Sequence, residues 1–250
     1  MPRLPVSGAE VALRAPNGAD DMVLHEAVGS PVEIGLALIA RLAGEGDWAG
    51  LTVTDYEALL LALHTAHFGQ DLALGFACPG CRERVEITIR VEDFLAGLRP
   101  RAVPGVAPDP ARPGWYRLAD AGFRLPTAGD QAAVAGLADP TRGLAERCLD
   151  EVARHRRHRG QVERAMAAMA PEVSRPLAGR CPACAAAVEA PLHVTRVVVG
   201  GLRRAAASVH DDVDLIARAY HWPEATILAL PQARRRAYAE RIRRAQPQAA

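Results

Sequence analysis

The sequence predicts an α+β fold that is mainly helical and contains two copies of a short cysteine-bearing motif. CPxC motifs at 78–81 and 181–184 each precede a segment in which apolar and polar residues alternate, as they do in half-buried strands. Most of the remaining chain has apolar residues at helical spacing. Half of the 250 residues are hydrophobic but only 4% are aromatic, so a core of Ala, Leu and Val is expected.

The two motifs are alike beyond their cysteines. Residues 78–91 align without a gap on residues 181–194, and each copy combines a tight Cys-Pro turn with a strand. The further identical positions are Val85/Val188, Glu86/Glu189 and Val91/Val194. Four thiolates in two such turns are the ligand set of a closed tetrahedral zinc site, so the chain is predicted to bind one structural zinc ion. The predicted ligands are Cys78, Cys81, Cys181 and Cys184.

The spacing of the cysteine pairs predicts a split zinc ribbon. An ordinary ribbon has roughly 15–20 residues between its pairs, whereas residues 82–180 separate them here. A helical insert is therefore expected between the two halves. A site with four protein ligands leaves no position open for water or substrate, so the metal is expected to hold the fold and to take no part in chemistry.

Disulfide and redox interpretations of the same cysteines stay open but are less favoured. The N-terminus shows no apolar signal segment of the kind that a secreted, disulfide-bonded protein would carry. A redox CxxC pair would lie at a strand–helix junction, whereas both pairs here precede a strand. Cys148 lies in a helical pattern and is expected to be an ordinary buried residue.

Residues 1–54 are predicted to hold a hairpin and a helix. Segments 11–14 and 22–25 have the pattern of short strands around a Pro-Asn-Gly turn at 16–18. Residues 31–42 have apolar residues at helical spacing.

Residues 55–98 combine a predicted helix with the first cysteine motif and its strand. Thr54 and Glu57 form a capping-box pattern, which predicts that a helix begins after Thr54 and ends near Gly69. His64 and His67 near that end could be spare metal ligands, although core or cap roles are favoured.

Residues 99–180 contain the predicted insert. Segment 99–114 is Pro-rich and loop-like, and segments 115–118 and 123–125 read as a hairpin. Residues 127–173 are helical in three short pieces, with breaks expected at Asp139-Pro140, Gly160 and Pro171.

Residues 181–194 form the second zinc-binding half, and residues 195–250 are predicted to be helical with an Arg-rich end. One long helix is expected over 195–220, in which a Gly-Gly pair at 200–201 indicates a bend or a close contact. Prolines at 223 and 231 open two further helices, the last ending near Arg244. The tail at 246–250 is expected to be disordered.

Charge and composition argue against several functional classes. The formal net charge is +1, so no global field attracts the chain to nucleic acid or membrane. No apolar stretch approaches the length of about 20 residues that a membrane span needs, and the protein is expected to be soluble and cytoplasmic.

No catalytic pattern stands out, so the chain is predicted not to be an enzyme. A phosphate-binding glycine loop, a nucleophile elbow and an HExxH motif are all missing from the sequence. The acidic group around His210, with Asp211, Asp212 and Asp214, is interpreted as a solvated helix face. Basic runs at 155–159 and 234–236, with Arg241, Arg243 and Arg244, are interpreted as either phosphate contacts or a solvated face.

The C-terminal third resembles the signature end of a known family. Between 212 and 238 a helix ends in Tyr220-His-Trp222, an acidic turn and an Ile-Leu-Ala-Leu segment follow, and an Arg-rich helix with Tyr238 comes last. This pattern is similar to that of the T4-type baseplate hub assembly chaperones of contractile phage tails and phage-tail-like contractile injection systems. Segments 59–69 and 123–127 also resemble the family, so the likeness covers most of residues 55–245. The first fifty residues are not covered, and Asp214 stands where family members often carry His, so any role of that His does not transfer.

The resemblance implies a non-enzymatic protein that assists assembly of the baseplate of a contractile tail, or becomes a minor component of it. Expected partners are baseplate or hub proteins, and the chain could be incorporated in the particle. The residues expected to contact a partner are Tyr220, Trp222, Arg234, Arg235 and Tyr238. The alternative prediction is a zinc-ribbon nucleic-acid-binding or regulatory protein that uses its arginine runs.

Overall fold

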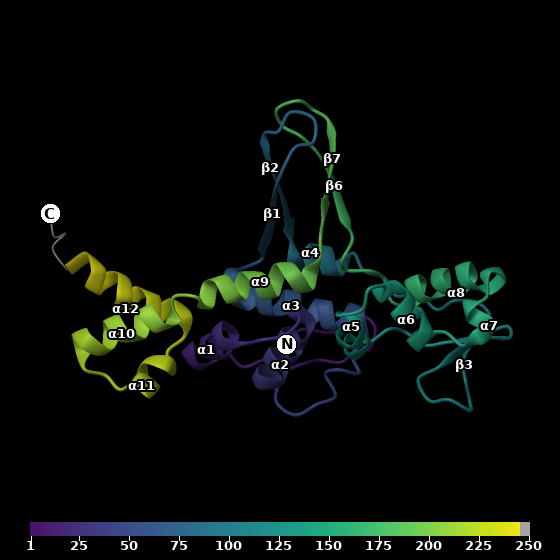
Figure 1. Cartoon of the computed structure of the whole chain (residues 1–250), viewed down its shortest axis with the longest axis horizontal. Helices are drawn as coiled ribbons and strands as arrows, with labels where there is room; N and C mark the ends of the chain where they lie inside the picture. The colour runs from purple at the N-terminus through teal and green to yellow at the C-terminus, as the bar shows by residue number, and fades with distance from the viewer. Residues whose placement is uncertain (246–250) are drawn as a thin grey trace.

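The computed structural model describes residues 1–245 and has four parts (Figure 1). A central helical body carries a projecting arm of two β-hairpins. A lobe formed by the insert lies at one end of the body, and a lobe of C-terminal helices lies at the other. The protein thus combines helices with small antiparallel sheets, in agreement with the predicted α+β class.

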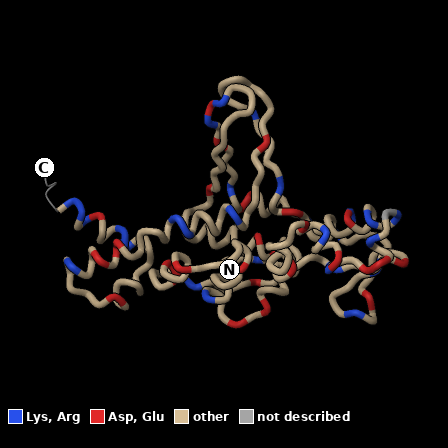
Figure 2. Tube along the Cα trace, in the orientation of Figure 1, with Lys and Arg blue, Asp and Glu red and all other residues tan. Residues whose placement is uncertain are grey.

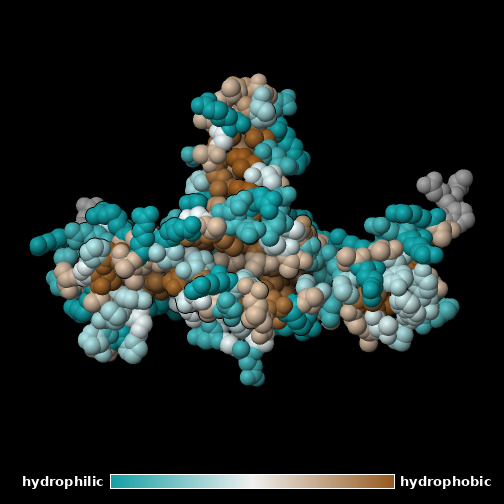
Figure 3. All heavy atoms as spheres, turned by 180° about the vertical axis from the view of Figure 1, so that it is seen from behind, coloured by the Kyte–Doolittle hydropathy of each residue, from teal (hydrophilic) through white to brown (hydrophobic). Residues whose placement is uncertain are grey.

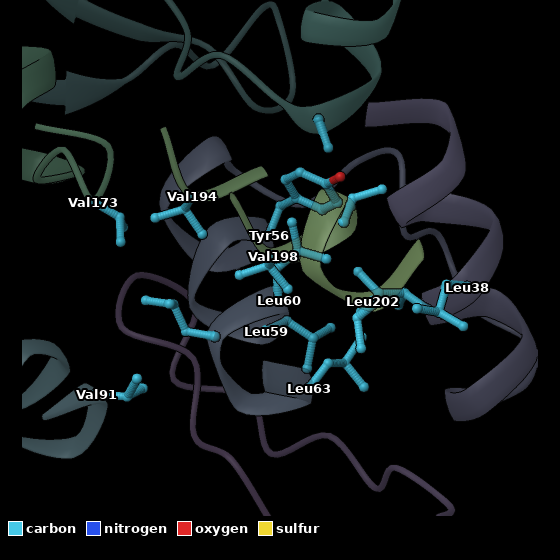
Figure 4. Packing of buried hydrophobic residues seen from close by; sticks show 14 of the residues in the cluster. Leu38, Tyr56, Leu59, Leu60, Leu63, Val91, Val173, Val194, Val198 and Leu202 are labelled. Carbon is cyan, nitrogen blue, oxygen red and sulfur yellow. The ribbon is translucent and has the colours of Figure 1, made fainter. Parts of the chain in front are cut away.

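The body is built around two helices from distant parts of the chain, α3 (Val53–Phe68) and α9 (Val194–Ala206), with α1 (Gly18–Glu26), α2 (Pro31–Ala43) and α4 (Val91–Ala96) around them. Aliphatic residues of α3 pack against Val194, Val198 and Leu202 of α9, and Leu38 of α2 lies on the same cluster (Figure 4). Tyr56 is fully buried there and donates its hydroxyl to Val32 O. This is the largest core of the described residues.

The predicted N-terminal hairpin is wrong, because residues 18–26 form helix α1. The side chain of Asn17 accepts the N–H of Ala19, and the carboxylate of Asp20 accepts the N–H of Asn17, which makes the Pro-Asn-Gly segment a helix start. Asp20 is buried and also binds the guanidinium groups of Arg14 and Arg41. Asn-Gly suits both a hairpin turn and a helix cap, and these contacts favour the cap.

Helix α3 begins slightly before the predicted position. Thr52, not Thr54, caps it by accepting the N–H of Asp55. The two residues assigned to the capping box make long-range contacts instead. Thr54 donates to Pro171 O, and Glu57 binds Ser174.

The arm consists of two antiparallel hairpins with matching registers. In the first, β1 (Asp71–Ala77) pairs with β2 (Arg84–Arg90). In the second, β6 (Pro176–Arg180) pairs with β7 (Ala187–Pro191). Ala77 lies opposite Arg84 in the first hairpin, as Arg180 lies opposite Ala187 in the second, so the same number of residues forms each turn. The strands after the cysteines were predicted, whereas the strands before them, β1 and β6, were not.

The insert lobe has a three-stranded sheet and four helices. Its strands are β3 (Val106–Pro108), β4 (Tyr116–Leu118) and β5 (Ala121–Phe123). A hairpin forms where one was predicted, but its second strand lies at 121–123 and not at 123–125, and a short strand is added within the Pro-rich segment. The helices are α5 (Ala128–Val134), whose Ala128 joins the core of the body, and α6 (Pro140–Cys148), α7 (Glu151–Arg154) and α8 (Arg156–Met169). The helical structure is interrupted before Pro140 and before Pro171, as expected. Gly160, however, lies inside α8 and does not interrupt that helix. A separate cluster around Phe123, Leu149 and Val162 forms the core of this lobe.

The C-terminal lobe contains α10 (Val209–Tyr220), α11 (Glu224–Leu228) and α12 (Gln232–Ala245). The single long helix predicted over 195–220 is in fact two helices, α9 and α10, separated at Ala207 and Ser208. The Gly-Gly pair does not cause this break. Beyond the break, Ile216 of α10 packs against Ile227 and Ile242. This cluster is a second core, separate from the core of the body to which α9 belongs. The predicted tail at 246–250 lies outside the described residues.

Candidate metal centre

The tip of the arm brings the four predicted cysteines together. Cys78 Sγ lies 3.7 Å from Cys184 Sγ, and Cys81 Sγ lies 3.6 Å from Cys181 Sγ. All four sulfurs lie within 4.8 Å of one another, and within the described residues they are the one group of three or more Cys, His, Asp and Glu placed to hold a metal ion. A tetrahedral ion with metal–sulfur bonds of about 2.3 Å has sulfurs about 3.8 Å apart. The cluster therefore has dimensions that fit a thiolate-bound metal such as zinc.

The separation of the sulfurs does not fit disulfides. A disulfide joins two sulfurs at about 2.05 Å, and the four thiols at the tip are free. Each pair across the tip also joins one cysteine of the first hairpin to one of the second, as a shared metal site requires.

The backbone of the two turns is the same. Cys78 donates its N–H to Glu83 O at 2.8 Å and accepts the N–H of Arg82 at 2.9 Å. The second turn repeats both bonds at the corresponding positions, Cys181 to Ala186 and Ala185 to Cys181, at 2.9 Å each. The residue after each pair adopts left-handed backbone angles, with φ 67° at Arg82 and φ 59° at Ala185. The tip thus has two copies of one turn, and each supplies two sulfurs.

The electrostatics of the tip favour a bound cation. The N–H groups of Cys81 and Gly80 donate to the sulfur of Cys78 and lower its pKa to about 7. The N–H of Glu83 lowers the pKa of Cys81, but desolvation and the neighbouring thiols outweigh it and raise that pKa to about 12. Four thiols this close cannot all ionise because their charges repel. A divalent cation would remove that obstacle and hold all four as thiolates.

A small apolar cluster supports the sulfurs from below. Val85 and Val188, which occupy the same position in the two hairpins, are buried against the cysteines. A Cβ on Gly179 would lie 3.2 Å from Ile87 Cδ1, so glycine allows β6 to approach β2 closely. Two sheets of two strands do not enclose their inner face, and apolar surface is visible along the arm below its tip (Figure 3). With this limited burial, a metal would be the main link between the two hairpins near the tip.

The predicted partner-contact residues separate into two groups. Tyr220, Trp222 and Tyr238 form one aromatic cluster, with ring centroids 5.2 Å apart for Tyr220–Trp222 and for Trp222–Tyr238. Tyr220 is 36% exposed, and Arg234 is exposed one turn before Tyr238 on α12. These residues lie on an accessible part of the C-terminal lobe.

Arg235 does not belong to that surface. Its side chain is fully buried and binds Asp21 of α1, and its Nε lies 3.6 Å from Asp212 of α10. It therefore joins the C-terminal lobe to the body and cannot contact a partner in this conformation.

The acidic group on α10 is not the solvated face that was predicted, because one member is buried. His210, Asp211 and Asp214 are exposed, whereas Asp212 is 1% exposed and forms ion pairs with Arg235 and Arg243. An i, i+3 or i, i+4 apolar pattern does not identify a buried carboxylate whose partner lies on another helix.

The remaining candidates have structural environments. His64 forms a hydrogen bond with Asp71 O at the start of β1, and His67 packs edge-on against Phe68. Cys148 is buried as predicted, with its sulfur 3.8 Å from Asp130. Within residues 1–245, no helix has the length and apolarity needed to cross a bilayer.

Charged residues of both signs are distributed over the body and both lobes (Figure 2). Comparisons of the chain with models of known protein families, with curated proteins and with solved structures gave no match.

Proposed function

We propose that this chain is a non-enzymatic zinc-binding protein that assists assembly of the baseplate of a contractile phage tail or a phage-tail-like injection system, or becomes a minor component of it. It acts in the cytoplasm of the producing cell and binds baseplate or hub proteins. The metal is one structural zinc ion held by the four cysteines of the arm.

The observation that carries this proposal is the four-cysteine centre at the tip of the arm. Its two halves come from hairpins far apart in the sequence, and four protein sulfurs would fill a tetrahedral ion completely. Such a site stabilises a shape and offers no position for a substrate. A projecting arm on a helical body is suited to contact with other proteins (Figure 1).

The baseplate assignment is supported by the resemblance of residues 212–238 and 59–69 to the assembly chaperone family. The aromatic residues of that pattern form the cluster of Tyr220, Trp222 and Tyr238, beside exposed Arg234. Exposed aromatic and arginine side chains are the residues that most often anchor protein interfaces. This cluster is the proposed contact surface for a tail protein.

A zinc-dependent nucleic-acid-binding protein is the alternative, because Arg234 and Arg241 are exposed. Two other arginines of the same run are engaged within the fold, and a third forms a surface ion pair. Arg236 donates to Ala205 O, and Arg243 and Arg244 pair with Asp212 and Glu240. The two stacked rings of Tyr220 and Trp222 also cover one face of each other. These contacts occupy part of this arginine run, and the net charge of +1 provides no global attraction to nucleic acid, so the protein-binding function is favoured.

Metal analysis tests the zinc site. The purified chain should contain one zinc ion, Cys181→Ser should lose it, and Cys148→Ser should retain it because that thiol lies in the insert lobe. Two metal ions per chain would contradict a shared site. Absence of metal from the purified chain, together with normal folding of Cys78→Ser and Cys181→Ser, would also contradict it.

Affinity purification from the producing host, followed by mass spectrometry, tests the partner. Hub, spike or baseplate wedge proteins should be recovered with the chain, and Tyr220→Ala with Arg234→Ala should reduce that recovery. Arg142→Ala, which changes an exposed arginine in the insert lobe, is the matched control. Recovery of nucleic acid or transcription proteins without tail components would support the alternative, especially if binding weakens steeply with salt.

A further inference from the structure

A cleft of about 520 Å³ lies between the body and the insert lobe. It is lined by the first turns of α3, the segment at 172–174 and one side of α8. Its volume falls within the range of about 300–1,000 Å³ that is usual for small-ligand sites. Most of the lining is apolar, including Val53, Met166 and Val173.

Glu57 contributes a buried carboxylate to this cleft, with only 3% of the residue exposed. Its Oε2 accepts the N–H of Ser174 at 3.0 Å, and its Oε1 lies 2.6 Å from Ser174 Oγ. That hydroxyl already accepts the N–H of Val194, which leaves its proton to be donated to Glu57. Both oxygens of Glu57 thus act as acceptors, which is the pattern of an ionised carboxylate.

The charge of Glu57 has no counter-ion among the described residues. Its partners are neutral, namely two donors of Ser174 and the nearby hydroxyl of Thr195, and the acidic neighbour Glu172 adds repulsion. The described residues that line the cleft include no Arg or His. Burial raises the pKa of Glu57, although the hydrogen bonds from Ser174 lower it. Because buried carboxylates are normally paired with a cation, this one has capacity for a positively charged ligand.

Further acceptors line the same cleft, namely the exposed carboxylates of Glu163 and Glu172 and the side chain of Gln131. The side-chain oxygen of Gln131 on α5 is buried, and no described residue donates a hydrogen bond to it. The hydroxyls of Thr54 and Ser174 are already used, the first as a donor to Pro171 O and the second as a donor to Glu57. The cleft therefore combines vacant acceptor capacity with aliphatic walls and lacks free donors among its described residues.

We propose that this cleft binds a protonated amine or guanidinium group on an aliphatic chain, with Glu57 as its counter-ion and Gln131 as a further acceptor. The apolar wall formed by α8 holds the chain of the ligand. A free alkylamine and a lysine or arginine side chain share this chemistry. The site is independent of the zinc centre and of the assembly role.

Calorimetric titration of the full chain with hexylamine at pH 7 tests the proposal, with hexanol and hexanoate as neutral and anionic matches. Saturable binding of hexylammonium, but of neither match, is expected. Glu57→Gln keeps the shape of the side chain and should weaken binding by about tenfold or more, as loss of a charged hydrogen-bond partner does. The control variant Glu189→Gln changes an exposed residue of the arm and should leave the affinity for hexylammonium unchanged.

Ala167→Trp provides a second variant that leaves Glu57 and its partners in place. Ala167 lines the cleft from an exposed position on α8, so a tryptophan there should fill the space and abolish binding. Capped lysine, Nα-acetyl-lysine N-methylamide, distinguishes a protein side chain from a free alkylamine as the ligand. If it binds more tightly than hexylammonium, the site is assigned to a side chain. If it binds more weakly, the site is assigned to a free amine. Equal binding of hexanol and hexylammonium, unchanged affinity in both variants, or no binding at millimolar amine would overturn the proposal.

Discussion

Replacement of Arg235 by methionine should remove the main charged link between the C-terminal lobe and the body. The guanidinium is fully buried between Asp21 of α1 and Asp212 of α10, which are 2% and 1% exposed. Methionine has a similar length but no charge, so the variant leaves Asp21 buried without a cation. A Cβ on Gly18 would lie 2.7 Å from Arg235 Nη1, which shows how closely α1 packs over this side chain.

The expected loss of stability is large. Breaking a buried ion pair by removing one partner costs about 3–5 kcal/mol. Arg243 remains 3.1 Å from Asp212, so only Asp21 loses its cation and the lower end, about 3 kcal/mol, is expected. With a urea m value of about 3 kcal/mol/M, the denaturation midpoint should fall by about 1 M.

Urea denaturation followed by circular dichroism measures this loss, with Arg234→Met as the matched control on the exposed side of α12. The control should change the free energy of unfolding by less than about 0.5 kcal/mol. Burial raises the pKa of Asp21, and the hydrogen bond from Arg235 lowers it, so the pKa should rise further in the variant. When the pKa of a carboxyl group is higher in the folded state than in the unfolded state, the free energy of unfolding decreases as pH rises. The loss of stability caused by Arg235→Met should therefore become smaller as pH falls. Equal midpoints for Arg235→Met and Arg234→Met would refute the structural role of this ion pair.

Three further changes test other parts of the fold. Asn17→Ala removes the cap of α1 and should lower the free energy of unfolding by about 1 kcal/mol in the same denaturation assay, whereas an unchanged value would contradict the capping role of Asn17. Burial alone would raise the pKa of Asp130, but hydrogen bonds from arginines led by Arg124 hold it well below its usual range. Its contribution to stability should therefore be complete above about pH 4 and be lost as pH falls further, and Asp130→Asn should flatten that part of the stability–pH curve. Gly179→Val places a side chain against Ile87 and should destabilise the arm by about 1–3 kcal/mol, seen as faster amide exchange in β6; unchanged exchange would contradict the close approach.

The arm was predictable from the sequence because it depends on local repetition. The cysteine turns and the strands after them have the same spacing in both copies, and the structure gives both hairpins the same register. Strands β1 and β6 escaped prediction, although Leu72, Leu74 and Phe76 alternate with small or charged residues and could have indicated the first of them. The second is short and contains Pro176 and Gly179, which weaken a strand pattern.

The misassigned elements depend on contacts between distant residues. Asn17-Gly18 fits either a hairpin turn or a helix cap, although Asp20 at the third helical position was available as evidence for the cap. The break between α9 and α10 contains neither glycine nor proline, and the packing of Ile216 in a second core accompanies it. Local propensity does not identify such a break, because the apolar stripe continues across it.

Sequence reasoning found the four cysteines of the candidate metal site but none of the buried charges. Cysteine spacing reveals a site directly because both ligand pairs are contiguous in the sequence. Asp212 was assigned to a solvated face, Arg235 to a partner contact and Glu57 to a capping box. All three are buried instead, because segments from elsewhere in the chain pack against them. The cleft beside Glu57 likewise forms only where the insert lobe meets the body.

The position of the cysteines also indicates which part of the molecule a metal would stabilise. At the base of the arm, Leu72, Val91 and Leu192 belong to the large core of the body and are buried without any help from a metal. Toward the tip, Val85 and Val188 have only a small cluster around them, and two-stranded sheets of this size are marginally stable in isolation. Zinc removal should therefore release the tip while the base and the body stay folded. A partner that recognises the arm would then lose affinity without loss of the global fold, which separates a role of the metal in shaping a contact surface from a role in folding the whole chain.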